Sequence, residues 1–261
     1  MHRFLIFALS ASALFAQLAP LNEKGVSIGH FHMFVGDPAV QKNVWVDAFG
    51  AEVTRVGGLE LLRLPGVYVV VGKARVAPTE GTEGSSAPHI GFAVKDLAGM
   101  KAKLEAMHIV TAPVPNSPKQ LMAKFPDKVD IELVEDSALA TPVAMHHFHL
   151  QSTDPEKLRD WYVKEFGARP GMRNNFWAAF LPGGEVDTRK AQTQPAPTKG
   201  RSMDHIGFEV KNLEAFCKQL VADGVELETP YTPMKDIGLA WAFVVDPAGT
   251  RIELTEGFAG R

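Results

Sequence analysis

Several of the nine histidines recur at fixed spacing beside strand-like segments. His30-Phe31-His32 is followed by an Asp-Pro pair, and so is His147-Phe148-His149, which lies 117 residues further along. His89-Ile90-Gly91-Phe92 returns as His205-Ile206-Gly207-Phe208 at an offset of 116. Imidazole nitrogens bind transition metals, and carboxylates complete many such sites. A single strand histidine is more often structural, but this repeated pattern indicates metal binding.

The repetition extends over most of the chain and identifies a tandem duplication. Phe49-Gly50-Ala51 matches Phe166-Gly167-Ala168, and Ile131-Glu132-Leu133 matches Ile252-Glu253-Leu254. The two copies predict two domains, residues 25–137 and 143–257, with a seam near residues 138–142.

Each copy divides again into two similar units. Alternating strands are predicted at the openings of the four units: His30–Val35, His89–Val94, His147–Gln151 and His205–Val210. A helical segment follows each opening strand. In the last unit, apolar residues from Leu213 to Val221 recur at helical spacing, and Gly224 is a common kind of helix end. Three short strands complete each unit, so the sequence predicts an α+β fold with four βαβββ modules.

This pattern resembles the vicinal oxygen chelate superfamily, which includes glyoxalase I, bleomycin-binding proteins and extradiol dioxygenases. The resemblance rests on the four strand openings and on the closing segment from Asp246 to Leu254, and it covers nearly all of residues 25–257. It implies that the modules pair into two glyoxalase-like domains with curled mixed sheets around a divalent metal ion. Fe, Zn, Ni, Mn and Co are all compatible with this implication.

The resemblance also implies metal ligands on three separate strands. In the second half these are His147, His205 and Glu253. Two imidazoles and one carboxylate leave coordination positions open, as a catalytic metal requires. The matching set in the first half is His30, His89 and Glu132. We expect weaker binding in the first half, because its final hairpin lacks the Asp-Pro-x-Gly turn of the second.

Some members of the family add a fourth, acidic ligand from the strand that precedes the second histidine. Glu185 and Asp187 occupy that region here, and they are either this ligand or a solvated acidic pair. A fourth ligand is typical of the isomerases and lyases of the family.

We expect Glu253 and His149 to be the catalytic residues. His149 lies two residues beyond the predicted ligand His147 and shares its strand face. His32 occupies the matching place in the first half. Both histidines are equally well explained as residues that line a pocket.

Three functions remain open on the sequence. The first is a metal-dependent lyase or isomerase acting on a small oxygen-rich substrate. The second is an Fe(II) extradiol-type dioxygenase, although position 243 holds Phe243 instead of tyrosine and no histidine occurs between His205 and Glu253. The third is a non-catalytic protein that binds a small ligand against aromatic side chains: Trp177, Phe180, Trp241 and Phe243.

Composition and the first residues set the expected context. A formal net charge of −3 gives no electrostatic reason to expect nucleic acid or an anionic membrane as partner. A single cysteine, Cys217, excludes an intrachain disulfide and a Cys-based zinc site. A basic start and the apolar run Phe4–Phe15 predict a signal peptide over residues 1–16, and hence a periplasmic or secreted protein without a membrane span. The expected partner is a small molecule, and a homodimer is compatible with the sequence.

Overall fold

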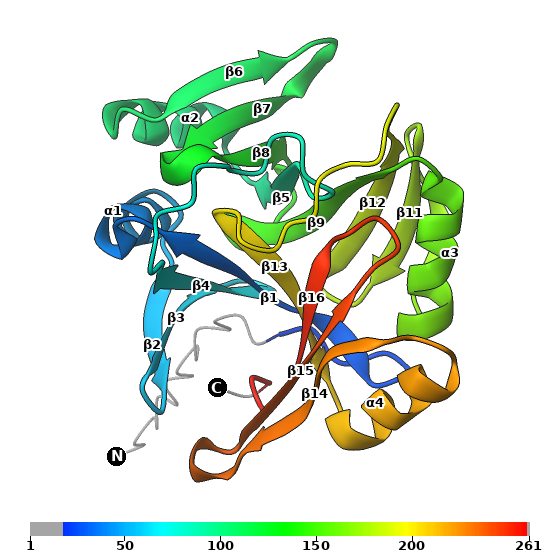
Figure 1. Cartoon of the computed structure of the whole chain (residues 1–261). Coiled ribbons are helices and arrows are strands. Elements are labelled where there is room, and N and C mark those ends of the chain that lie inside the picture. The colour runs from blue at the N-terminus through cyan, green and yellow to red at the C-terminus, as the bar shows by residue number, and fades with distance from the viewer. Residues whose placement is uncertain (1–17, 260–261) are drawn as a thin grey trace, which may run out of the picture.

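The computed structural model describes residues 18–259 and contains four βαβββ modules in chain order (Figure 1). The α+β fold predicted from the repeats is therefore confirmed. The predicted signal peptide, residues 1–16, lies outside the described residues. Among residues 18–259, no helix is both long enough and apolar enough to cross a membrane.

The four modules have the same order of elements. The first comprises β1 (Val26–Val35), α1 (Pro38–Asn43), the π-helical turn η1 (Val44–Ala48), β2 (Glu52–Val56), β3 (Leu59–Leu64) and β4 (Val67–Lys73). The second comprises β5 (His89–Val94), α2 (Leu97–Ala106), β6 (Val110–Val114), β7 (Ser117–Phe125), η2 (Pro126–Lys128) and β8 (Val129–Glu135). The third comprises β9 (Val143–Ser152), α3 (Pro155–Phe166), β10 (Arg169–Arg173), β11 (Phe176–Leu181) and β12 (Gly184–Lys190). The fourth comprises β13 (Met203–Val210), α4 (Leu213–Ala222), β14 (Leu227–Met234), η3 (Lys235–Ile237), β15 (Leu239–Val245) and β16 (Arg251–Glu256).

Helix boundaries follow from local sequence. Asp37 and Asp154 each cap a helix by accepting a hydrogen bond from a backbone N–H of the first turn, and a proline at the first helical position follows each of them. Helix α3 ends at Gly167, whose φ of 67° is accessible to glycine without strain. Cys217 is buried on α4, as the apolar spacing predicts.

The modules pair across the two halves of the chain (Figure 1). The first sheet has the strand order β14-β15-β16-β13-β1-β4-β3-β2 and combines the first and fourth modules. The second sheet has the order β10-β11-β12-β9-β5-β8-β7-β6 and combines the second and third. The ranges 25–137 and 143–257 therefore mark the repeats in the sequence, whereas each sheet takes one module from each repeat.

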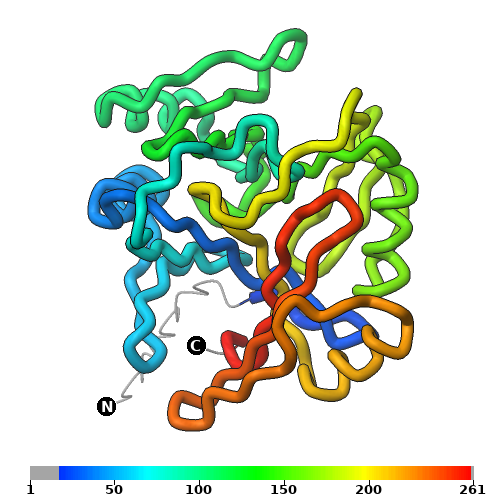
Figure 2. Tube along the Cα trace, in the orientation of Figure 1, coloured from blue at the N-terminus to red at the C-terminus, as the bar shows by residue number. Residues whose placement is uncertain are grey.

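The lengths of the connections between modules are consistent with this pairing. Seven residues, 136–142, join the second and third modules within one sheet, whereas 15 residues (74–88) and 12 residues (191–202) pass between the sheets. The two long connections meet each other (Figure 2). There, Ser86 N donates to Ala196 O at 2.8 Å, and Ala196 N donates to Gly84 O at 3.1 Å. The long connections give the first and last modules enough chain to meet.

Each sheet has one face against the main core and one face available for a site. Along β4, Val67 and Val69 belong to the main hydrophobic core, whereas Tyr68 and Val70 belong to a separate small cluster. Alternate strand residues point to opposite faces, so Tyr68 and Val70 share their face with the residues that pair with them on β1. The first of these partners is His30, which pairs with Tyr68.

Candidate metal centre

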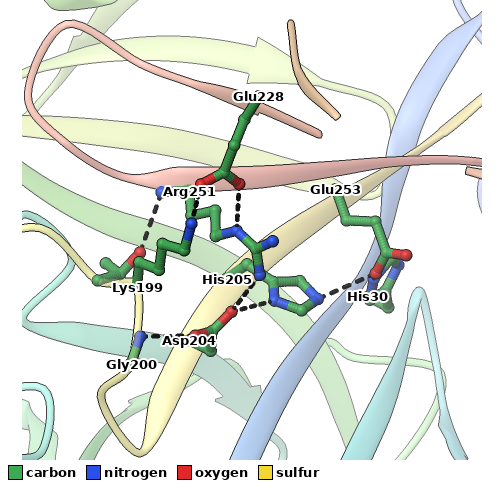
Figure 3. Close-up of polar contacts among 9 residues, drawn as sticks. His30, Lys199, Gly200, Asp204, His205, Glu228, Arg251 and Glu253 are labelled. Atoms are coloured by element: carbon green, nitrogen blue, oxygen red, sulfur yellow. Dashed lines mark hydrogen bonds and ion pairs between the residues drawn. The ribbon is translucent and has the colours of Figure 1, made fainter. Parts of the chain in front are cut away.

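Three predicted ligands converge on the open face of the first sheet: His30 from β1, His205 from β13 and Glu253 from β16. We call this group site 1. Glu253 Oε2 lies 2.8 Å from His30 Nε2 and 2.9 Å from His205 Nε2 (Figure 3). The three donor atoms lie within 4.8 Å of one another. Two imidazoles and one carboxylate form a donor set that suits Zn, Fe and related divalent ions.

The expected convergence of His147, His205 and Glu253 is wrong, because His147 belongs to the other sheet. His147 instead joins His89 and Glu132, and we call these three residues site 2. Glu132 Oε2 lies 3.1 Å from His147 Nε2 and 3.3 Å from His89 Nε2. Each site thus combines residues of both halves, because the opening strands of modules from different halves pair side by side.

A glycine makes the approach of the ligands possible in each site. In the first sheet, Gly207 pairs with His30 on one side and with Glu253 on the other. A Cβ atom at this position would lie 2.1 Å from His30 Cε1, so the imidazole occupies space that only glycine leaves free. Gly91 has the same role in site 2, where a Cβ would lie 2.0 Å from His147 Cε1.

A network of charged side chains orients His205 (Figure 3). Asp204 Oδ1 lies 2.7 Å from His205 Nδ1. Because a carboxylate only accepts, Nδ1 carries the hydrogen, and Nε2 faces Glu253. Arg251 Nη1 also donates to Asp204 Oδ1 at 2.7 Å, and its Nε donates to Glu228 Oε2 at 2.5 Å. This network fixes the ring orientation of His205 and keeps a hydrogen on its Nδ1.

Replacement of the carboxylate beside His205 should weaken metal binding. We expect Asp204→Asn to lower the affinity of site 1 for Zn(II) by about 10- to 100-fold, because outer hydrogen-bond partners orient metal-ligating histidines. Competition titration with a chelator measures this change. Asp160→Asn, a change at an exposed acid on α3, is the matched control and should leave the affinity unaltered. Equal affinities in the two variants would contradict the orienting role of Asp204.

The charge state of site 1 favours a bound cation. Burial raises the pKa of Glu253, but the hydrogen bonds to His205 and His30 outweigh it and hold that pKa well below its usual range. Burial lowers the pKa of His205, but its hydrogen bonds to Asp204 and Glu253 raise it above the usual value. Glu253 is thus a carboxylate at neutral pH, and the site attracts a positive charge, either a proton or a metal ion.

Site 1 opens onto a cavity of about 640 Å³. Its lining is mostly apolar and includes Phe34, Leu59, Val70, Trp241, Phe243 and Phe258. Two of the four aromatic residues predicted for a binding cup, Trp241 and Phe243, therefore line this cavity. The other two lie on β11 in the second sheet, where Arg159 stacks on Trp177 and Arg169 stacks on Phe180.

Val70 and Asp187 occupy matching places beside the two sites. On β4, Val70 pairs with His32; on β12, Asp187 pairs with His149 at the same offset of 117 residues. In site 1, Glu253 on β16 pairs with the residue two positions after His205. Val70 on β4 pairs in the same way with the residue two positions after His30, so Val70 and its counterpart Asp187 are the positions from which a fourth ligand would come. Site 1 therefore has three candidate ligands, and its fourth place is apolar.

The predicted acidic pair lies beside site 2, where a cation already binds it. Arg173 Nε lies 2.8 Å from Glu185 Oε1, and Arg173 Nη2 lies 2.5 Å from Asp187 Oδ2. Burial and the neighbouring Asp187 raise the pKa of Glu185 to about 7, although Arg173 opposes the shift. The alternative of a solvated acidic pair is wrong, because Glu185 is 6% exposed and Asp187 is fully buried.

The two residues predicted to be catalytic, His149 and Glu253, lie in different sheets and do not share a site. His149 belongs beside site 2, where its ring stacks on His89 with centroids 4.4 Å apart. Its counterpart beside site 1 is His32, which lines the cavity and lies 4.8 Å from the His205 ring, centroid to centroid. Burial and the nearby His205 lower the pKa of His32 to about 3, so it is a neutral imidazole.

Asp204 and Arg251 are the site residues that the repeat pattern did not identify. Asp204 is a charged residue in β13, a strand that is buried along its whole length. A charged side chain within a buried strand requires an oppositely charged or hydrogen-bonding partner. An acidic residue in such a strand is therefore the signal by which the sequence could have indicated Asp204.

Comparisons with known proteins agree with this architecture. Residues 144–254 match the family model of the Glyoxalase/Bleomycin resistance protein/Dioxygenase superfamily. Glyoxalase I from Zea mays superposes with a TM-score of 0.70 at 16% identity, covering 88% of this chain and 92% of that one. A protein from Bacillus subtilis subsp. subtilis str. 168, described as a candidate dioxygenase, superposes with a TM-score of 0.68 at 16% identity, covering 94% of this chain and 88% of that one.

A comparison with curated protein sequences finds no match. At 16% identity, the two superpositions establish the fold alone. The family model matches the second half of the chain, and the whole chain shares the fold of the two solved structures. Residues 144–254 are thus similar in sequence to the Glyoxalase/Bleomycin resistance protein/Dioxygenase superfamily, within a tandem protein of four βαβββ modules.

Proposed function

We propose that this chain is a divalent-metal-dependent enzyme whose active centre is site 1. The observation that carries the proposal is the convergence of His30, His205 and Glu253 on the wall of a cavity of about 640 Å³. A bound metal ion would act there as a Lewis acid that stabilises negative charge on two neighbouring substrate oxygens. The glycine at position 207 supports this use, because it leaves room for the His30 ring to face Glu253.

The cavity favours a small substrate with an apolar body. Aromatic side chains form much of its wall, and Arg251 is the only Lys or Arg among its described lining residues. The Arg251 guanidinium is already paired with Asp204 and Glu228 and lies 3.7 Å from the centre of the Phe243 ring. A glutathione adduct, with its carboxylates, would meet no free guanidinium or ammonium group there. We therefore do not propose the glyoxalase I reaction for this chain.

The number of candidate metal ligands at site 1, three instead of four, favours a dioxygenase over a lyase or isomerase. A two-histidine, one-carboxylate set with open positions is typical of non-haem Fe(II) oxygenases. The lyase or isomerase reaction, which the sequence favoured, is typical of sites with a fourth acidic ligand, and Val70 occupies that place here. The proposed reaction incorporates both atoms of O2 into an aromatic vicinal diol and cleaves one carbon–carbon bond of its ring.

A lyase or isomerase is the second candidate, because Phe243 provides no hydroxyl group where extradiol dioxygenases have a tyrosine. In either reaction His32 would accept a hydrogen bond from a substrate hydroxyl and orient it over site 1. Phe258 and Trp241 would exclude water from the bound substrate.

Metal analysis and oxygen uptake together test the proposal. Protein purified anaerobically should contain about one divalent ion per chain, and the Fe(II) form should consume O2 when supplied with aromatic vicinal diols. Conversion of α-hydroxy carbonyl compounds without O2 uptake would replace the dioxygenase with the lyase or isomerase. If the protein binds none of Fe, Zn, Ni, Mn and Co, the enzyme proposal fails, and a small-ligand-binding protein takes its place.

We further propose that the protein is exported to the periplasm or secreted. The basic start, the apolar run from Phe4 to Phe15 and the small residue Ala16 support this location. N-terminal sequencing of the protein from its native host should begin near Gln17. Recovery of the intact chain with Met1 from the cytoplasm would contradict export.

A further inference from the structure

The two sites have the same ligand types but different surroundings. At an offset of 117 residues, three residues beside site 1 correspond to three beside site 2. Those beside site 1 belong to a buried apolar cluster: Val56, Tyr68 and Val70. Those beside site 2 are all charged: Arg173, Glu185 and Asp187. Site 2 therefore has an internal cluster of ion pairs at the positions where site 1 has an apolar wall.

We propose that the Arg173 guanidinium takes the place of a divalent metal ion at site 2, so that site 1 alone binds metal. The Arg173 guanidinium forms an ion pair with the carboxylate of Asp187. Asp187 lies at the β12 position from which a fourth metal ligand of site 2 would come. The guanidinium also places a permanent positive charge beside a site that would otherwise attract a dication. This inference rests on the proposed function only in assigning the metal to site 1.

Arg173 also lies beside a ligand ring of site 2. Its Nη2 lies 3.5 Å from Nδ1 of His147, the ring whose Nε2 faces Glu132 at 3.1 Å. A metal ion held by this ring would therefore share it with a permanent positive charge. In site 1, by contrast, the charged group beside His205 Nδ1 is the Asp204 carboxylate, at 2.7 Å.

Buried nitrogen and oxygen atoms without a hydrogen-bond partner show that site 2 retains potential metal donors. Both ring nitrogens of His149 are buried without a hydrogen-bond partner, and so is Asp187 Oδ1. His149 is 2% exposed and stacks on His89. His89, His147 and His149 also each offer a donor atom within 4.8 Å of the others. Removal of the guanidinium should therefore restore metal binding.

Copying the wall of site 1 into site 2 tests the proposal directly. The variant Arg173→Val/Glu185→Tyr/Asp187→Val gives site 2 the residues found at the three corresponding positions of the first half: Val56, Tyr68 and Val70. Co(II) is the probe, because bound Co(II) is counted by elemental analysis and is visible by its d–d absorption. The full-length wild-type chain should bind about one Co(II), and the triple variant about two, with the second lost on adding His89→Ala.

Single changes at position 173 separate charge from repacking. Arg173→Met should also raise the stoichiometry to about two, with Asp187 free to bind. Arg173→Lys keeps the positive charge and should stay at one. Circular dichroism and thermal unfolding identify any variant that fails to fold, and the triple variant and Arg173→Met remove the guanidinium by independent routes.

The outcomes distinguish this inference from the proposed function. If wild-type protein binds no Co(II) but the triple variant binds one, site 1 loses its assigned role and the exclusion by Arg173 stands. If wild-type protein binds two ions, one of which is lost in His89→Ala, Arg173 does not exclude metal and the inference is overturned. It is equally overturned if the folded triple variant binds no more Co(II) than wild type.

Discussion

His205→Ala should abolish metal binding at site 1, with the metal content falling from about one ion per chain to near zero. His205 provides one of three donors, and Val70 occupies the fourth place beside site 1. The nearby imidazole of His32 is not among the donor atoms that lie within 4.8 Å of one another. We expect a loss of affinity greater than about 100-fold, beyond the range of changes at outer hydrogen-bond partners. Elemental analysis and chelator titration measure the loss, and circular dichroism verifies the fold.

His89→Ala is the matched control. It removes an imidazole from the corresponding strand of the duplicated site, but His89 lies in the second sheet with Glu132 and His147. Its metal content should equal that of wild type. A full complement of metal in His205→Ala, or its loss in His89→Ala, would show that site 1 is not the metal centre.

Gly207→Ala should displace the His30 ring and weaken metal binding at site 1 by at least about tenfold. The added Cβ would meet His30 Cε1 at 2.1 Å, closer than any non-bonded contact, so the imidazole must leave the position in which it faces Glu253. Misplaced ligands cost affinity because the donor geometry of a metal site is restrictive. Chelator titration of the purified variant measures the change.

Gly91→Ala provides the comparison for this glycine. Its Cβ would meet His147 Cε1 at 2.0 Å and disturb site 2 to the same extent. Metal affinity at site 1 should then be unchanged. If the two alanine variants bind metal equally well, the space above Gly207 has no role in positioning a ligand.

Much of the fold followed from the sequence because its signals are local. The Asp-Pro pairs at Asp37 and Asp154 predicted helix starts that the structure confirms. The offsets of 117 and 116 identified four equivalent modules, and the order of strands within each module is the same. Caps, alternation and repeats depend on neighbouring residues, and so they can be recognised without knowledge of the tertiary structure.

The pairing of modules could not be recognised in this way. All four opening strands have the same pattern, so β13 could pair equally well with β9 or with β1 on pattern alone. The structure pairs β13 with β1. The short link of residues 136–142 was the available signal, because it leaves the second and third modules to share a sheet.

The sequence by itself therefore determined the module, its fourfold repetition and the residue types of the candidate ligands. Only the tertiary structure decided which ligands meet: His30 with His205 and Glu253, and His147 with His89 and Glu132. It also placed Arg173 against Asp187, 14 residues away along the chain on a different strand. The physical reason is that residue types and periodicity are local properties, whereas a metal centre depends on strands that pair over long separations in sequence.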